Sequence, residues 1–114
     1  MFVALYFIAM MKKYSEQIEQ LARFAKAMGH PARIEILKFL VSRDDCFFGD
    51  IHDVLPIAKA TVSQHLSELK NAELIQGIIY PPKVKYCINP ESWKLVKELF
   101  DELMNSYCGC KYNC

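Results

Sequence analysis

The chain has 114 residues, of which 53% are hydrophobic and 24% are charged, and its formal net charge is +1. This length suits a single domain, and the near-neutral charge excludes a uniformly basic nucleic-acid coat protein. Positive charge is uneven, however: residues 12–43 carry seven basic and three acidic side chains, residues 44–55 carry four Asp, and residues 56–86 carry four basic and two acidic side chains. Any contact with a polyanion must therefore be local.

Five cysteines form an odd set, and three of them lie in the last seven residues. A disulfide framework in a secreted protein more often has an even number of cysteines spread along the chain. We therefore expect reduced thiols and a cytoplasmic protein. Cys46 and Cys87 are expected to be small core or strand residues rather than ligands.

Residues 1–11 form an apolar leader, too short to span a bilayer and without a basic segment or a small-residue cleavage site. Met11 begins a second plausible start, so we interpret the leader as a start-site artefact, with an extra dimer-packing segment as the alternative. No membrane partner is expected.

Two helices are predicted in the first half of the chain. Ser15 suits the N-cap of a helix that continues to about Ala27, and Pro31 suits the first position of the next helix. Helical spacing predicts that their buried faces are Ile18, Leu21, Ala22 and Ala25, and then Ile34, Leu37, Leu40 and Val41.

A third, short helix is predicted from Phe48 to Leu55, with Phe48, Ile51, Val54 and Leu55 facing inward. Four residues then connect it to a helix within residues 57–75, whose narrow apolar stripe is Val62, Leu66 and Leu69. A short helix, a tight turn and a helix with a polar outer face is the helix-turn-helix pattern.

The outer surface of the helix within residues 57–75 is small, hydroxylated, amide-bearing or basic, which suits phosphates and base edges better than a solubilising role. We therefore interpret it as a recognition helix for double-stranded operator DNA. The candidate DNA contacts on it are Lys59, Thr61, Ser63, Gln64, Ser67 and Lys70.

A β-hairpin is predicted next, from strand-like runs at residues 74–80 and 84–88 around Pro81, Pro82 and Lys83. A hairpin after a recognition helix is a wing. Lys83 and Lys85 could reach phosphates or the minor groove. The alternative is that these lysines only protect a sheet edge from aggregation.

Asn89 and Pro90 are predicted to begin a last helix with more apolar surface than a small core can absorb. Dimerisation through this helix, together with the first, would cover that surface and supply two recognition helices for a palindromic operator. Its apolar residues are Trp93, Leu95, Val96, Leu99, Phe100, Leu103, Met104 and Tyr107.

The segments AKAMGHPARIEILKFL (residues 25–40) and TVSQHLSELKNAELI (residues 61–75) resemble the ArsR/SmtB family of small winged-helix repressors. The resemblance implies a mainly α fold with a small β-hairpin: a winged helix-turn-helix domain over residues 12–107, dimeric through its terminal helices. It also implies a homodimeric transcriptional repressor that leaves its operator when an effector binds. By this resemblance Ser63 and Gln64 are DNA contacts, while His65 fits helix packing better than base contact.

Two positions depart from the family pattern. Glu73 stands where the recognition helix often ends in glycine, so either Glu73 adopts a left-handed conformation or the turn differs. At the third helix, DCFFGDI (residues 45–51) replaces the ELCVCDL of arsenic and cadmium sensors, which puts Phe47 and Gly49 at the two cysteine positions. The last helix also lacks the histidines of zinc and cobalt sensors, so both usual effector sites are incomplete.

The cysteine-rich tail, residues 108–114, offers another effector site. Cys108, Cys110 and Cys114 could converge on one thiophilic ion, and three sulfurs suit As(III) better than the four-ligand site of structural zinc. The alternatives are redox sensing by the same thiols and a tail without function. No cofactor is expected to be required for folding.

No phosphate-binding loop and no paired nucleophile and base occur by motif, so an enzyme is not expected. The alternative to a DNA-binding regulator is a winged-helix protein-interaction module that does not read DNA, because fold alone does not determine function.

Overall fold

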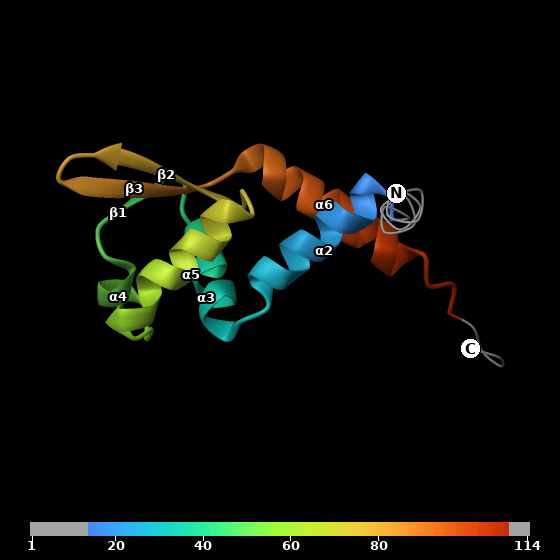
Figure 1. Ribbon diagram of the computed structural model, residues 1–114, viewed down its shortest axis with the longest axis horizontal. Helices are drawn as coiled ribbons and strands as arrows, with labels where there is room; N and C mark the ends of the chain where they lie inside the picture. Colours follow the sequence, from blue (N-terminus) through green and yellow to red (C-terminus); the bar gives the residue numbers. More distant parts are fainter. Residues whose placement is uncertain (1–13, 110–114) are drawn as a thin grey trace, which may run out of the picture.

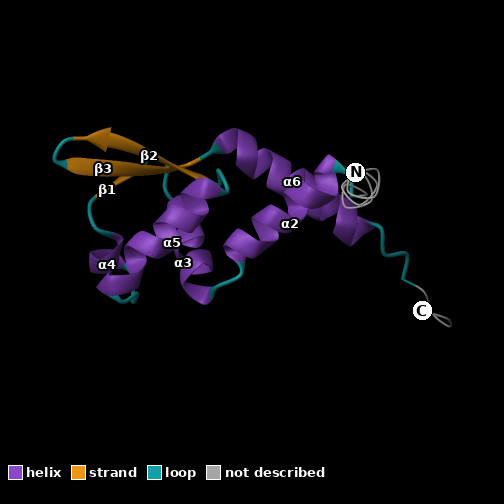
Figure 2. Ribbon diagram, in the orientation of Figure 1, coloured by secondary structure: helices purple, strands orange, loops and turns teal. Residues whose placement is uncertain are grey.

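The computed structural model describes residues 14–109 and shows a mainly helical protein with a small sheet (Figures 1 and 2). This confirms the predicted winged helix-turn-helix architecture, while the leader prediction for residues 1–11 lies outside the described residues. The elements in chain order are α2 (Glu16–Met28), α3 (Pro31–Val41), β1 (Phe47–Phe48), α4 (Ile51–Val54), α5 (Lys59–Asn71), β2 (Ile75–Tyr80), β3 (Lys83–Ile88) and α6 (Pro90–Asn105).

The elements separate into two groups (Figure 1). The helices α3, α4 and α5 gather beneath the sheet, while α2 and α6 lie side by side and project away from it, with the C-terminal end of the described chain at their far side. The helix-turn-helix and the wing therefore form one end of the molecule, and the α2–α6 pair forms the other.

Three helices begin at side-chain caps that satisfy a free backbone N–H of the first turn. Ser15 Oγ accepts a hydrogen bond from the N–H of Ile18 at 3.2 Å, and Asn89 Oδ1 accepts one from the N–H of Ser92 at 3.4 Å. His30 caps α3 in the same way and precedes Pro31. The predicted starts of these helices are confirmed.

The core lies between α2, α3, α5 and the base of the sheet, and its fully buried side chains are Phe24, Ile36, Leu37, Ile51, Leu69 and Leu74. The predicted inward faces of α2 and α3 are partly wrong. Phe24 and Ala27 are the buried residues of α2, whereas Ile18 is 57% exposed, and Ile34 of α3 is exposed while Ile36 is buried. Of the apolar face predicted for α2, Leu21 packs against the core, whereas Ile18, Ala22 and Ala25 are exposed.

The sheet has three antiparallel strands in the order β1-β3-β2. The wing hairpin pairs Ile75 with Ile88 at its base and Tyr80 with Lys83 at its tip, so the predicted hairpin is confirmed. Pro81 and Pro82 form the turn.

Strand β1 corrects the predicted third helix, because residues 47–48 pair with β3 instead of starting a helix. Phe47 is buried with its ring edge on Phe39, at a centroid distance of 5.0 Å, and Phe48 is exposed. Gly49 then takes a φ of 128°, a conformation that favours glycine, and α4 begins only at Ile51. Val54, predicted to face inward, is 46% exposed.

Within residues 14–109, no helix is both long enough and apolar enough to cross a bilayer.

Candidate nucleic-acid interface

Helix α5 has one buried side and one polar exposed side. Its buried residues are Val62, His65, Leu66 and Leu69, and with about 100° between successive residues the opposite side carries Ala60, Gln64, Ser67 and Asn71. The polar row is therefore available to a ligand, while the buried stripe fixes the rotation of the helix. The six candidate contacts on α5 are all exposed: Lys59, Thr61, Ser63, Gln64, Ser67 and Lys70.

The turn before α5 is held by backbone contacts and by one side chain of α4. The ring Nδ1 of His52 lies 3.0 Å from the carbonyl oxygen of Ile57, whose side chain is buried. The N–H of Leu55 donates to the carbonyl of Ile51 at 2.9 Å. These contacts set the angle between the two helices of the motif.

The N-terminus of α5 has no side-chain cap. Ala58 stands at the cap position, and the hydroxyl of Thr61 donates back to the Ala58 carbonyl at 3.0 Å. The backbone N–H of Thr61 donates to the same carbonyl at 3.0 Å, and no side chain caps the N–H groups before it, beside Lys59. Such a helix start favours an anion such as a DNA phosphate.

His65 ties α5 to the junction between α2 and α3. Its Nδ1 accepts a hydrogen bond from Nε of Arg33 at 3.2 Å, and Arg33 Nη1 also donates to the carbonyl of Ala27 at 3.3 Å. The His30 ring lies 4.5 Å away between centroids. Burial, followed by the nearby His30 and Arg33, lowers the pKa of His65 below its usual 6.5. The prediction that His65 serves helix packing is confirmed, whereas the role of Arg33 was not predicted.

The end of α5 resolves the alternatives at Glu73. Its φ is 64°, so a non-glycine residue does occupy the left-handed conformation, and the next residue, Leu74, donates to the carbonyl of Leu69 at 3.0 Å. Lys70 lies over the start of the wing: a methyl group placed on Gly77 would come within 3.1 Å of Lys70 Nζ. Lys70 thus sits where α5 meets β2.

The two wing lysines have different surroundings. Lys83 is exposed beside the turn, whereas Lys85 is half-buried, with its ammonium 5.5 Å from the ring centroid of Phe48 and 5.9 Å from that of Tyr80. Lys83 is therefore the freer of the two to reach a phosphate, and Lys85 also stabilises the aromatic pair.

A small cavity of about 140 Å³ separates α5 from the sheet. Lys59 and Ser63 line it on the helix side, with Asp50 and Tyr86 opposite. Burial, and to a smaller degree the charge of Asp50, raises the pKa of Tyr86, so this phenol is neutral near pH 7. Because Lys59 and Ser63 line this cavity, they lie on the side of α5 that faces the wing, next to Gln64.

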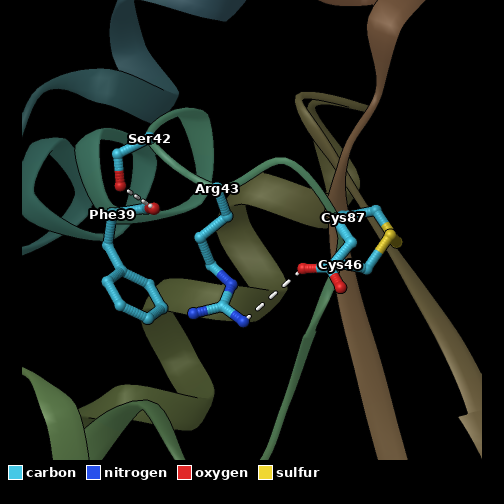
Figure 3. A network of polar contacts seen from close by, with 6 residues as sticks. Phe39, Ser42, Arg43, Cys46 and Cys87 are labelled. Carbon is cyan, nitrogen blue, oxygen red and sulfur yellow. Dashed lines mark hydrogen bonds and ion pairs between the residues drawn. A yellow bond between two sulfur atoms is a disulfide. The ribbon is translucent and has the colours of Figure 1, made fainter.

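Two cysteines overturn the expectation of reduced thiols. Cys46 and Cys87 form a disulfide, and their sulfur atoms point away from Phe39 and Arg43 (Figure 3). Sequence reasoning missed this bond because the two residues are 41 positions apart and meet only through the pairing of β1 with β3. The Arg43 guanidinium lies 5.4 Å from the Phe39 ring centroid, and its Nη2 lies 3.6 Å from Oδ1 of Asp45.

The metal-site prediction rests largely outside the described residues. Cys108 is an exposed free thiol, while Cys110 and Cys114 lie beyond residue 109. Within residues 14–109, no three His, Cys, Asp or Glu side chains come together as a metal site. The tail site stays a prediction.

Comparison with known proteins places this site in a family. Residues 30–76, which include α3, α4 and α5, match the model described as bacterial regulatory protein, arsR family. The chain is 30% identical over 90 residues to the HTH-type transcriptional regulator YgaV of Escherichia coli K12, covering 79% of this chain and 88% of that protein.

Two further relatives extend the likeness over nearly the whole described fold. An HTH-type transcriptional regulator of Methanocaldococcus jannaschii is 33% identical over 88 residues, covering 77% of this chain and 99% of the relative. The solved structure of an ArsR-like transcriptional regulator from Rhodococcus sp. RHA1 superposes with a TM-score of 0.65 at 17% identity, covering 81% of this chain and 86% of that one. Together with the exposed helix α5 and its wing, these matches show that the chain belongs to the arsR family of helix-turn-helix transcriptional regulators.

Proposed function

We propose that the protein is a homodimeric, sequence-specific repressor that binds duplex operator DNA through α5 and the wing. The observation that carries this proposal is the exposed row of Gln64 and Ser67 opposite a fully packed stripe on α5. An amide such as Gln64 can pair with adenine in the major groove, and Ser67 can bond either a base or a phosphate. Lys83 would add a phosphate contact from the wing.

The α2–α6 pair supports the homodimer. A groove of about 420 Å³ runs between the two helices, and Ile18, Leu21, Leu99 and Leu103 line it. Ile18 is 57% exposed and Leu103 is 53% exposed. A second copy would cover this apolar surface and present two α5 helices in a symmetric arrangement, as a palindromic operator requires.

For the effector, the proposal is a thiophilic ion such as As(III), bound by Cys108, Cys110 and Cys114. Support comes from the chemistry of three nearby thiols and from the exposed Cys108 at the end of α6, next to the proposed dimer surface. Redox sensing by the same thiols is the competing effector proposal. A cytoplasmic location and the absence of enzyme activity are part of the same proposal, since its ligand is chromosomal DNA.

The test is selection of binding sites from a random duplex library with the full chain, followed by fluorescence anisotropy on the recovered duplex. We expect recovery of a two-fold symmetric sequence and an affinity that falls steeply with salt. A library that converges on no sequence would contradict DNA reading and would favour a protein-interaction module, in which the face of α5 contacts a protein partner instead.

The effector arm repeats the anisotropy measurement with arsenite, Cd²⁺, Zn²⁺ and peroxide. Arsenite is expected to release the DNA from the wild-type chain and to leave a variant with Cys108, Cys110 and Cys114 all changed to Ser bound. Release of that variant by arsenite would contradict the tail site.

A further inference from the structure

We propose that Cys46 and Cys87 form a reversible redox site whose state sets the affinity for DNA by locking β1 to the wing. This inference rests on the proposed DNA-binding function and concerns thiols other than those of the tail. The pair differs from an incidental contact of two cysteines, because the bond continues the ladder in which Phe47 faces Tyr86 and Phe48 faces Lys85.

The bond encloses every element proposed to touch DNA. Cys46 precedes β1 and Cys87 is the last but one residue of β3, so the ring closed by the disulfide contains α4, α5 and the hairpin up to Cys87. Closing such a ring restricts the relative motion of the segments at its two ends. The redox state of one bond therefore bears on both the helix-turn-helix and the wing.

Without the bond, little else would hold the wing beside α4. Strand β1 contributes only two residue pairs to the sheet. A hollow of about 510 Å³ lies between the α4 region, at Asp50 and Asp53, and the hairpin, at Pro82 and Val84. The remaining contacts of β1 are those of its two rings: Phe48 lies 5.7 Å from the Tyr80 ring with the Lys85 ammonium over both, and Phe47 packs on Phe39 of α3. These contacts allow β1 to shift once the sulfurs separate.

The disulfide lies on the face of the sheet opposite to the buried Phe47 ring. Because side chains alternate along a strand, the buried Phe47 places Cys46 and the exposed Phe48 on the opposite, outward face. Cys46 is half-buried and Cys87 is 8% exposed, so exchange is expected to begin at Cys46. The Cα atoms are 4.5 Å apart, as in a non-hydrogen-bonded antiparallel pair, within the range that a disulfide spans.

The oxidant we assign is a low-molecular-weight disulfide such as oxidised glutathione. The Cys46 thiolate attacks one sulfur of that disulfide, forming a mixed disulfide and releasing one thiolate. The Cys87 thiolate then attacks the Cys46 sulfur, closing the protein disulfide and releasing the second thiolate. The protein loses two electrons and two protons, and the reagent gains both as two thiols. A dithiol reductant reverses the exchange.

The oxidised form is the tighter DNA binder. The disulfide holds the wing and the helix-turn-helix in one arrangement before DNA arrives, so less conformational freedom is lost on binding. Reduction is expected to weaken binding to the selected duplex by about fivefold or more, the lower end of typical coupling between two sites.

The experiment compares the full chain after treatment with oxidised glutathione and after treatment with dithiothreitol. Mass spectrometry after thiol alkylation reports the Cys46–Cys87 state, anisotropy reports affinity for the selected duplex, and hydrogen exchange reports protection of residues 46–50. We expect the reduced chain to show further alkylation at Cys46 and Cys87, faster exchange in this segment and weaker binding. Equal affinities, or tighter binding by the reduced chain, would overturn the proposal.

Two variants separate the sites. The double variant Cys46→Ser with Cys87→Ser should bind the selected duplex with the affinity of the reduced chain, and oxidised glutathione should not change that affinity. The affinity of the triple tail variant should respond to oxidised glutathione as that of the wild type does. If the double variant does not fold, reduced and alkylated wild-type protein replaces it. If no duplex is selected, the proposed DNA binding is contradicted, but hydrogen exchange still tests whether the disulfide restrains β1. Equal protection of residues 46–50 in the oxidised and reduced chains would overturn this restraint.

Discussion

Glu73 follows α5 with a φ of 64°, in a conformation that costs a side-chain-bearing residue roughly 1 kcal/mol. Replacing Glu73 by Gly should remove that cost and raise the free energy of unfolding by up to about 1 kcal/mol. Glu73→Ala is the matched control, because Ala keeps the Cβ atom and should give no such gain. Chemical denaturation of the three proteins measures the difference, and equal gains for Gly and Ala would contradict the strain.

His65 should make the fold sensitive to acid. Its pKa is below the usual 6.5 in the folded chain, so the unfolded chain binds the proton first as the pH falls. The free energy of unfolding contributed by this residue is therefore undiminished above pH 6.5 and decreases as the pH falls below 6.5 toward the folded pKa.

His65→Gln provides the comparison, since the amide oxygen can still accept from Arg33 but does not titrate. Denaturation curves between about pH 7.5 and 5.5 should show a smaller loss of stability for this variant than for the wild type. Parallel losses in both proteins would assign the acid sensitivity to other groups.

The sequence predicts which side chains of α5 are exposed to solvent better than it predicts long-range contacts between side chains. Gln64 and Ser67 follow from helical periodicity, because a stripe of Val62, Leu66 and Leu69 leaves only one side for solvent. The bond from Arg33 to His65 joins residues 32 positions apart and depends on how α3 crosses α5, which periodicity does not encode.

Among the elements, the wing makes the clearest electrostatic prediction. Lys83→Ala should weaken binding to selected and shuffled duplexes alike and reduce the slope of log affinity against log salt by about 1. Lys94→Ala is the control, since Lys94 is exposed on α6, in the other half of the molecule. A salt titration followed by anisotropy measures the affinity and its salt dependence for both variants. An unchanged slope of log affinity against log salt for Lys83→Ala would contradict a phosphate contact by the wing.

Strand β1 shows why one element escaped sequence analysis. Two residues are too few for alternation to register, and Phe48 and Ile51 fit a helical spacing equally well. Residues 47–48 form a strand because they pair with β3 in the folded chain. Phe47 is buried beside Phe39, and Gly49 follows the strand with a φ of 128°. The disulfide of Cys46 depends on the same pairing and was missed for the same reason.

The exposed apolar surface of the α2–α6 pair predicts a dimer. Leu103→Glu should place a carboxylate in the groove beside Ile18 and shift the protein to monomer, because burying an unpaired charge is costly. Sedimentation velocity measures the oligomeric state. Val41→Glu, an equal change at an exposed residue of α3, should leave it unchanged. A Leu103→Glu variant with the wild-type oligomeric state would contradict this interface.

The order of the helices and the hairpin could be predicted from the sequence because each prediction rested on several residues. Caps at Ser15 and Asn89 and the turn at Pro81 mark element ends that the structure confirms. Which face of α2 is buried could not be predicted, because its apolar residues belong to two different surfaces. Phe24 is buried in the core, and Ile18 faces outward beside α6.

Whether α5 reads base sequence is tested by the specificity ratio of a Gln64 variant. This ratio is the dissociation constant for a shuffled duplex divided by that for the selected duplex, measured at one salt concentration. Gln64→Ala should lower it by roughly 5- to 150-fold, the range for one bidentate base contact, and leave the affinity for the shuffled duplex unaffected. Asn105→Ala, which removes an exposed amide from the end of α6, should leave both affinities unchanged. An unchanged ratio for Gln64→Ala would contradict the assignment of α5 as the recognition helix.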